Sequence, residues 1–122
     1  MKTFRDLKVW QEAHALVKGL YRATGGFPES EAYGLRSQVR RAAVSVPTNI
    51  VEGFKRDGRT DQVRFFNIAQ ASLEETKYLL LLSHELGFLA GEAHATLDSQ
   101  AETVGKMLHG LKRGWKSRGQ GR

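Results

Sequence analysis

The sequence predicts an all-α protein folded as an antiparallel up-and-down four-helix bundle. Apolar residues recur at three- and four-residue spacing in four segments, as they do along the buried face of an amphipathic helix. Short breaks containing Gly or Pro separate the segments, and no segment has the period-two alternation typical of strands. Long helices joined by short turns pack as antiparallel neighbours, so one bundle is the expected architecture.

The first predicted helix covers residues 10–24. One side of it carries residues that we expect to be buried: Trp10, Ala13, His14, Val17, Leu20, Tyr21 and Thr24. On that side His14 is expected to be a hydrogen-bonded core histidine. Asp6 is the expected N-cap of this helix, the Gly pair at 25–26 ends it, and Ser30 followed by Glu31 is expected to start the next helix.

The second predicted helix, residues 35–53, contains a proline in its interior. Its apolar side consists of Leu35, Val39, Ala42, Val46, Ile50 and Gly53. Pro47 cannot donate to the carbonyl four residues back, so we expect the helix to kink or restart near Val46. Gly53 has no side chain on the buried side, which permits the close approach of another helix. Asn49 and Glu52 are expected to bond backbone groups freed at the kink; contact with a ligand or a neighbouring subunit is the alternative.

The third predicted helix, residues 61–86, is apolar on more of its circumference than one core can cover. After a turn at Gly58, Thr60 is its expected N-cap. Its main buried side consists of Phe65, Phe66, Ala69, Ser72, Leu73, Thr76, Leu80 and Ser83. Consecutive residues lie about 100° apart around an α-helix, so Tyr78, Leu81 and Leu82 fall on the reverse side. We expect a surface outside this monomer to cover them.

The fourth predicted helix has a narrow apolar seam and contacts its partners along one edge. The seam consists of Leu97, Ala101, Val104, Leu108 and Leu111. We expect residues 1–114 to form the bundle domain and residues 115–122 to be a basic, flexible C-terminal tail. Trp115 in that tail has two alternative roles, which are stacking on a base and packing against the protein.

Length and composition limit the class of protein. With 122 residues and 40% hydrophobic content, the chain is long enough for one modest core. It contains no cysteine, which excludes disulfides, thiolate metal sites and cysteine nucleophiles. The charged N-terminal segment does not resemble a signal peptide, and the leucine run at 79–82 is too short to span a bilayer. We therefore expect a soluble cytoplasmic protein with no membrane partner.

The formal net charge of +6 is unevenly distributed along the chain. Residues 1–61 carry eleven Lys/Arg against seven Asp/Glu, residues 62–111 carry three against six, and residues 112–122 carry five basic and no acidic residues. Basic surfaces attract phosphates, and such contacts weaken steeply with salt. The predicted nucleic-acid-binding residues are Lys55, Arg56, Arg59, Arg64, Lys112, Arg113, Lys116 and Arg118. A charged surface without a partner is the alternative.

One strip of the second helix combines arginines with β-branched apolar residues. Arg36 and Arg40 lie one turn apart, and Val44 and Val51 continue that side of the helix. Valines gain nothing from contact with water, so a protein interface rimmed by arginines explains the strip better than a solvated face does. The predicted oligomer interface is Arg36, Arg40, Val44, Val51, Tyr78, Leu81 and Leu82.

No constellation of residues indicates catalysis. Di-iron sites in helical bundles use Glu-x-x-His on two helices, whereas the Glu/His pairs of this sequence are one or two residues apart and diverge around their helices. The serines lack a nucleophile-elbow motif, and there is no glycine-rich phosphate loop. We therefore predict no enzyme activity, no catalytic residue, no metal, no cofactor and no small-molecule substrate. The remaining histidines are expected at the surface or against a partner: His84, His94 and His109.

Three stretches resemble the four-helix-bundle family of proteins encoded in bacterial 23S rRNA intervening sequences. They read FRDLKVWQEAHALV, YGLRSQVRRAAVSVPTNIVEGFKR and FFNIAQASLEETKYLLLLSHELGFL, and the resemblance covers about residues 4–111. That family is similar to the accessory variability determinant of diversity-generating retroelements, a basic, barrel-like homopentamer that engages reverse transcriptase and nucleic acid.

The resemblance implies a bacterial protein that assembles into a ring-like homopentamer with helix surfaces buried between subunits. It places the most characteristic positions of the family at Arg36, Arg40, Arg41, Pro47, Asn49, Glu52 and Gly53. The biochemical role of the family is largely undefined, so the resemblance constrains the architecture more than the function.

Two functional hypotheses follow from the charges, the apolar surplus and the resemblance. The first is a non-enzymatic oligomer whose basic surface binds RNA or another nucleic acid, as an accessory to a nucleic-acid enzyme. The second is a protein-only scaffold or adaptor, in which the arginines pair with acidic groups of a neighbouring subunit or another protein, since residues 62–111 are net acidic.

Overall fold

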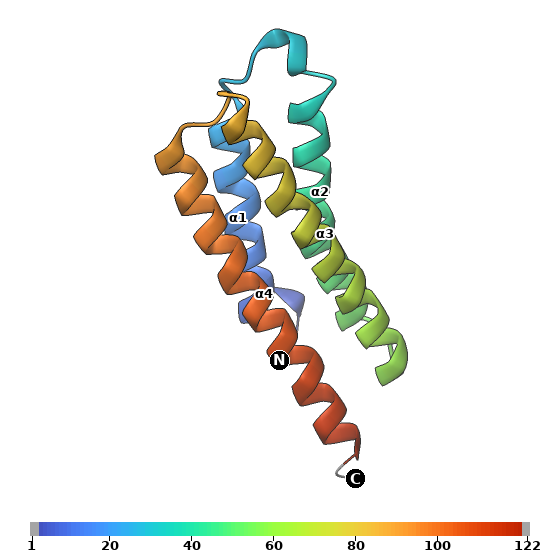
Figure 1. Ribbon diagram of the computed structural model, residues 1–122. Helices are drawn as coiled ribbons and strands as arrows, with labels where there is room; N and C mark the ends of the chain where they lie inside the picture. The colour runs from blue at the N-terminus through green and yellow to red at the C-terminus, as the bar shows by residue number, and fades with distance from the viewer. Residues whose placement is uncertain (1–2, 121–122) are drawn as a thin grey trace.

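The protein is a bundle of four helices. The computed structural model describes the backbone of residues 3–120 and the side chains of residues 3–114. The elements, drawn in Figure 1, are η1 (Phe4–Asp6), α1 (Lys8–Thr24), η2 (Glu29–Glu31), α2 (Leu35–Phe54), α3 (Arg59–Glu85) and α4 (Gly91–Gln120), where η marks a 3₁₀ turn. The described residues contain no strand. The predicted all-α fold is confirmed.

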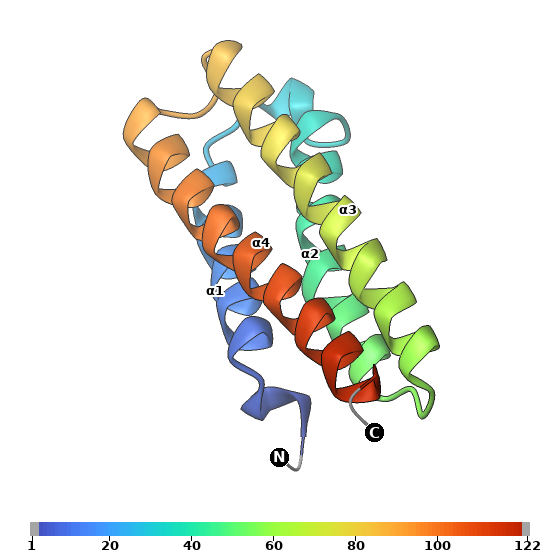
Figure 2. The same ribbon diagram turned by 60° about the horizontal axis from the view of Figure 1, so that its bottom comes forward.

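Each helix packs against two others, so the bundle is closed. α2 packs on α1 and α3, and α4 packs on α3 and α1, whereas the described parts of α1 and α3, and of α2 and α4, do not approach closely. Consecutive helices run in opposite directions (Figures 1 and 2). The α2–α3 turn and the C-terminal end of α4 therefore lie at the same end of the bundle as the N-terminus.

Aliphatic and aromatic side chains from all four helices fill the core. The large, fully buried ones include Leu16, Leu20, Val39, Val46, Ile50, Phe66, Leu73, Leu80, Val104 and Leu108. Each stabilises the fold by about 1.5–3 kcal/mol when it leaves water. Thr24, Thr76 and Ser83 are also buried, and each hydroxyl donates to the carbonyl oxygen four residues back. Within the described residues no buried side-chain polar atom lacks a hydrogen bond, so the core contains no uncompensated polar group.

α2 and α3 come into close contact where Gly53 of α2 meets Phe66 of α3. A Cβ at Gly53 would lie 2.5 Å from Phe66 Cε1 and 3.0 Å from the carbonyl oxygen of Gln62. Both distances are shorter than van der Waals contact allows, and Phe66 is fully buried and has no room to move. The prediction that Gly53 permits the close approach of another helix is confirmed.

Arg40 joins α2 to the last turn of α1. Its Nε donates to Thr24 Oγ1 at 2.9 Å, and its Nη2 donates to the carbonyl oxygen of Tyr21 at 3.0 Å. The guanidinium carbon lies 4.3 Å from the centre of the Tyr21 ring. A cation is favourable at a helix C-terminus, where carbonyl oxygens carry partial negative charge. Arg40 therefore fastens its own chain together; its predicted contact with another subunit stays a prediction.

α2 is one helix through Pro47, so it does not restart near Val46; a kink at that point, the other alternative, stays a prediction. The proline removes one donor, and the next two side chains hydrogen-bond to carbonyls of the preceding turn. Thr48 Oγ1 donates to the carbonyl oxygen of Val44 at 2.7 Å, and Asn49 Nδ2 donates to that of Ser45 at 2.8 Å. Pro47 itself is buried, so packing of its ring also supports the helical path.

Asn49 and Glu52, one turn apart on α2, behave differently. Asn49 bonds the carbonyl oxygen of Ser45, whereas the carbonyl that Pro47 leaves without a donor is that of Ala43, and it also bonds the hydroxyl of Ser45 at 3.0 Å. That hydroxyl in turn bonds Ser72 of α3 at 2.8 Å. Glu52 does not bond freed backbone groups as we expected, because its carboxylate is paired with Arg56 at 2.9 Å instead.

The helix starts differ from those predicted from single capping residues. Asp6 belongs to a capping box with Thr3 around η1, and α1 begins after Leu7 without a side-chain cap. The segment after Ser30 is the 3₁₀ turn η2; α2 begins at Leu35, whose amide donates to Glu31 Oε1 at 3.0 Å. α3 begins at Arg59, so Thr60 lies inside its first turn and Gly58 takes the N-cap position. In each case a short turn precedes the helix and moves its first residue.

His14 is exposed, so its predicted place in the core is wrong. The buried side of α1 follows Ala13, one residue and about 100° away around the helix. The imidazole ring instead stacks on Trp10, with ring centres 4.7 Å apart and planes 13° from parallel.

We predict that Gly53→Ala lowers the free energy of unfolding by about 1–3 kcal/mol, because the added methyl group overlaps Phe66 and Gln62. Gly110→Ala is the matched control, since nothing lies within 4 Å of a Cβ at that position of α4. The control should be neutral or stabilising by up to about 1 kcal/mol, as alanine favours helix. Thermal or urea unfolding of both variants measures the difference, and equal effects would contradict the close packing.

We also predict that Arg40→Ala destabilises the fold by about 1–3 kcal/mol, because the end of α1 loses a charged hydrogen-bond donor. Arg41→Ala serves as control, since Arg41 is exposed and makes no hydrogen bond within the described residues. It should change stability by less than about 0.5 kcal/mol. Indistinguishable unfolding midpoints for the two variants would show that the Arg40 contacts contribute nothing.

Candidate nucleic-acid interface

The turn between α2 and α3 is exposed and rich in cations. Lys55, Arg56 and Arg59 are all exposed there, together with Asp57 and Gly58. The turn forms because α2 ends at Phe54 and Gly58 adopts the extended conformation from which α3 starts. Lys55 and Arg59 make no ion pair within the described part of the chain, so both side chains are free to contact a partner.

Two arginines lie against Phe65 at the start of α3. The guanidinium carbons of Arg56 and Arg64 are each 4.6 Å from the centre of the Phe65 ring. Asp61 links them, at 3.0 Å from Arg64 and 3.9 Å from Arg56. These contacts fix the orientation of both guanidinium groups while leaving them exposed, with 41% of the Arg56 side chain and 61% of the Arg64 side chain open to solvent.

The C-terminal part of α4 brings a second set of cations to the same place. Lys112 Nζ donates to Asn67 Oδ1 at 2.8 Å, which attaches α4 to α3 one turn beyond Arg64. Arg113 is exposed beside it. Two predicted clusters that are far apart in the sequence thus meet at one end of the bundle (Figure 2). We call this surface the basic end, defined by Lys55, Arg56, Arg59, Arg64, Lys112 and Arg113.

Carboxylates partly neutralise the basic end. Glu52, Asp57 and Asp61 lie among its cations, so its charge is lower than the sequence clusters suggested. The opposite end of the bundle carries Glu29, Glu31, Glu85 and Glu92 around its connections. The predicted phosphate-binding residues Lys116 and Arg118, like Trp115, lie outside the residues whose side chains are described. The backbone of α4 is helical to Gln120, and the flexibility of residues 115–122 stays a prediction.

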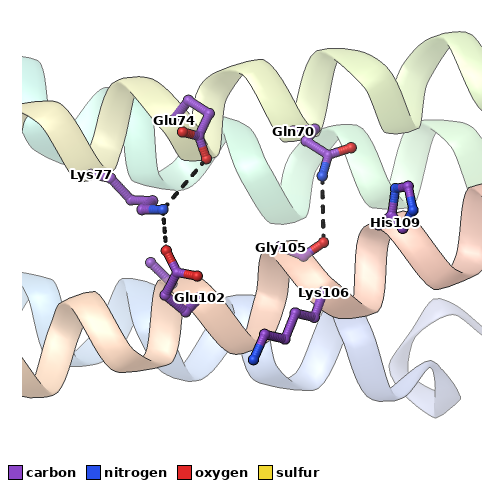
Figure 3. A pocket seen from close by; sticks show the side chains of 8 residues that line it. Gln70, Glu74, Lys77, Glu102, Gly105, Lys106 and His109 are labelled. Carbon is purple, nitrogen blue, oxygen red and sulfur yellow. Dashed lines mark hydrogen bonds and ion pairs between the residues drawn. The ribbon is translucent and has the colours of Figure 1, made fainter.

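Sequence reasoning missed a groove between α3 and α4 that leads away from the basic end (Figure 3). Gln70 and Lys77 line it from α3, and Lys106 and His109 line it from α4. On α4 the basic side chains 106, 109 and 113 are three and four residues apart, which places them on one face. That spacing can be seen in the sequence. Only the packing of α4 on α3 shows that these side chains form the wall of a groove.

Lys77 is held in an ion-pair network at the far end of this groove. Its ammonium group hydrogen-bonds Glu102 of α4 and lies 3.7 Å from Glu74. The hydrogen bond from Lys77 lowers the pKa of Glu102, and the same bond raises the pKa of Lys77. The contribution of Glu102 to stability is therefore present above its unfolded-state pKa and is lost as the pH falls through its lowered folded-state pKa. Glu102 is solvent-exposed, so that contribution is small.

The predicted oligomer interface is only partly open in the single chain. Val44, Tyr78 and Leu81 expose 39%, 59% and 42% of their surface, which is unusual for apolar side chains of this size. Val51 is half-buried, and Leu82 packs against the core. Arg36 is half-buried as well. Further exposed apolar side chains are Tyr21, Tyr33, Ile68 and Leu86.

Two of the three remaining histidines form a pair, and the third, His109, is exposed. His84 and His94 stack with ring centres 5.0 Å apart, and His84 Nδ1 lies 2.9 Å from the carbonyl oxygen of Leu89. Across the described residues, no group of three His, Cys, Asp or Glu side chains gathers closely enough to hold a metal ion. None of the described helical segments is both long and apolar enough to cross a bilayer.

Comparison with known proteins places the chain. No match is found among curated proteins. Among solved structures, the fold is similar to a protein of unknown function from the S23 ribosomal protein family of Bacteroides thetaiotaomicron VPI-5482, with a TM-score of 0.76 and 21% sequence identity. That match covers 85% of this chain and 97% of the other. Residues 5–110 match the 23S rRNA-intervening sequence protein family. The chain therefore belongs to the 23S rRNA-intervening sequence protein family, as three stretches of its sequence predicted.

Proposed function

We propose that this protein is a non-enzymatic, cytoplasmic oligomer that binds RNA through its basic end. The observation that carries the proposal is the convergence of the α2–α3 turn and the end of α4, joined by the hydrogen bond from Lys112 to Asn67. Cations that are dispersed in the sequence form one surface there. The opposite end of the bundle is acidic, so an anionic partner is oriented toward the basic end.

The arrangement of the arginines suits phosphate contacts. Arg56 and Arg64 are held against Phe65 in fixed orientations, so binding costs them less side-chain entropy than it would cost mobile arginines. Lys55 and Arg59 are exposed and add charge that is not fixed in place. Contacts of this kind to the backbone of RNA supply affinity but little sequence specificity.

Assembly would multiply this modest surface. The exposed Val44, Tyr78 and Leu81 support burial of α2 and α3 surfaces between copies of the chain. The resemblance to the accessory variability determinant adds the homopentamer, and an accessory role beside a nucleic-acid enzyme, to the proposal. A ring that repeats one basic end several times raises avidity without any new chemistry.

A protein-only scaffold is the second candidate. Residues 62–111 are net acidic, and the exposed Arg41 makes no ion pair within the described residues. Pairing of such arginines with carboxylates of a neighbouring copy or another protein would explain the charges without nucleic acid. The two candidates differ in one measurable property: the first predicts salt-dependent binding of RNA, and the second predicts no binding of RNA.

We predict that the protein binds structured RNA at low salt and that Lys55→Ala combined with Arg59→Ala weakens this binding. The slope of log affinity against log salt should become shallower by about 0.7–0.9 for each lost phosphate contact. Lys18→Ala combined with Arg22→Ala is the matched control, because both of those exposed cations lie on α1 away from the basic end. Fluorescence anisotropy across a salt series measures both variants.

Undetectable binding of the unmodified protein at low salt would overturn the nucleic-acid proposal. Equal losses in the two double variants would also overturn it, because binding would then follow net charge rather than the basic end.

The assembly predicts that the purified protein sediments as an oligomer of its 13.6 kDa chain. Tyr78→Asp combined with Leu81→Asp should release monomers, because a carboxylate buried in an interface is costly. Tyr33→Asp is the control, since Tyr33 is 98% exposed and lies in the α1–α2 connection. Analytical ultracentrifugation at micromolar concentration is the measurement, and a compact monomer of the unmodified protein would refute the assembly.

A further inference from the structure

The groove between α3 and α4 has a floor of small residues and walls of polar ones. Ala101 and Gly105 form the floor, and a Cβ at Gly105 would already touch Leu73 at 3.4 Å. The resulting hollow has a volume of about 370 Å³. The amide of Gln70 spans it and donates to the carbonyl oxygen of Gly105 at 3.4 Å, as Figure 3 shows.

A second, smaller hollow continues the groove to the basic end. It has a volume of about 130 Å³ and is lined by Asn67, His109, Lys112 and Arg113. His109 lines both hollows, so the two lie next to each other along α4. We call the two hollows together the track, and its mouth is the smaller hollow, which Lys112 and Arg113 of the basic end line.

The charge of the track falls with distance from the basic end. Lys112 and Arg113 lie at its mouth, and Lys106 lies about two helical turns further along α4. Lys106 makes no ion pair in the described residues, although its charge contributes to the lowered pKa of Glu102. Beyond Lys106, the carboxylates of Glu74 and Glu102 enclose Lys77, so an anion gains nothing by extending past them.

The basic side chains of α4 recur at the interval of a helical turn. His109 follows Lys106 by three residues, and Arg113 follows His109 by four, so each is about 5 Å further along the helix axis. A row of donors at this interval suits the successive phosphates of an extended strand. The amides of Asn67 and Gln70 on the facing wall add neutral hydrogen-bonding groups.

We propose that this groove holds a single-stranded segment of nucleic acid, whose phosphates pass from Arg113 along His109 to Lys106 and stop at Glu74 and Glu102. The inference rests on the nucleic-acid binding proposed above and names the form of the partner. Adjacent packed helices have axes about 8–10 Å apart, so the surface groove along their contact is narrow and suits one strand lying along it better than a duplex. A basic groove that follows one strand is the common mode of single-strand binding. The described part of the groove has no Phe, Tyr or Trp side chain, so no stacking of bases on large aromatic rings is expected.

The test compares Lys106→Ala combined with His109→Ala against the control Lys18→Ala combined with Arg22→Ala. All four side chains are exposed, so both variants should keep the unfolding midpoint of the parent. The probes are a fluorescent oligouridylate and an RNA duplex of the same length. We expect the groove variant to bind oligouridylate several-fold more weakly, with a salt slope shallower by about 0.7 per lost contact. Its affinity for the duplex should be unchanged.

A gain of affinity provides an independent arm. Glu102→Gln removes a negative charge from the end of the track and leaves Lys77 with a neutral acceptor in place of a carboxylate. This variant should bind oligouridylate more tightly than the parent, a result that misfolding does not produce. Glu85→Gln is the control for the loss of one negative charge, because Glu85 is an exposed carboxylate at the C-terminal end of α3, away from the track.

The outcomes separate the two proposals. If the groove variants bind oligouridylate as the parent does while the Lys55 and Arg59 double variant is weakened, the groove is overturned and the basic end stands. Equal losses for oligouridylate and duplex in the groove variant overturn the single-strand assignment. Binding of neither probe by the parent protein overturns both proposals.

Discussion

Phe66 packs against the bare backbone of Gly53, and this contact sets the position of the α2–α3 turn, which carries part of the basic end. It brings α2 and α3 together just before the turn that joins them, at a distance that a single methyl group would prevent. Because Phe66 points into the core, Phe65 points about 100° away and reaches the surface between Arg56 and Arg64. The same packing that closes the core thus supplies the ring on which the two arginines rest.

The basic end contains both cations that are paired with carboxylates and cations that are not. Asp61 and Glu52 hold Arg56 and Arg64 in place and cancel part of their charge, while Lys55 and Arg59 remain unpaired within the described chain. Fixed and mobile cations therefore lie side by side. The carboxylates therefore lower the net positive charge of this end of the bundle, while Lys55 and Arg59 keep their full charge at the surface.

Predictions of whole helices from the sequence were confirmed, because many residues share one pattern. Predictions about single residues such as His14 were less successful. The four helices and the need for a glycine at 53 follow from the apolar spacing. His14 was misplaced because the predicted buried side included Trp10, which is half-buried, and Tyr21, which is exposed, whereas the true buried side lies one position away. Pro47 does not end α2, and its ring is buried in the packing of the helix. Arg40 was predicted to lie in an oligomer interface. Within its own chain it donates hydrogen bonds to Thr24 and Tyr21 at the end of α1.

By itself the sequence determined that the chain forms four amphipathic helices, that α2 approaches a neighbour at Gly53, and that the cations lie in two clusters. These features depend on periodicity and on residue size, both of which are local. Only the tertiary structure decided that the two clusters meet, that Asp61 lies between Arg56 and Arg64, and that Lys106 and His109 line a groove. Those relations depend on which faces of two helices meet and at what register. That choice is made by the packing of the whole core, and no single segment encodes it.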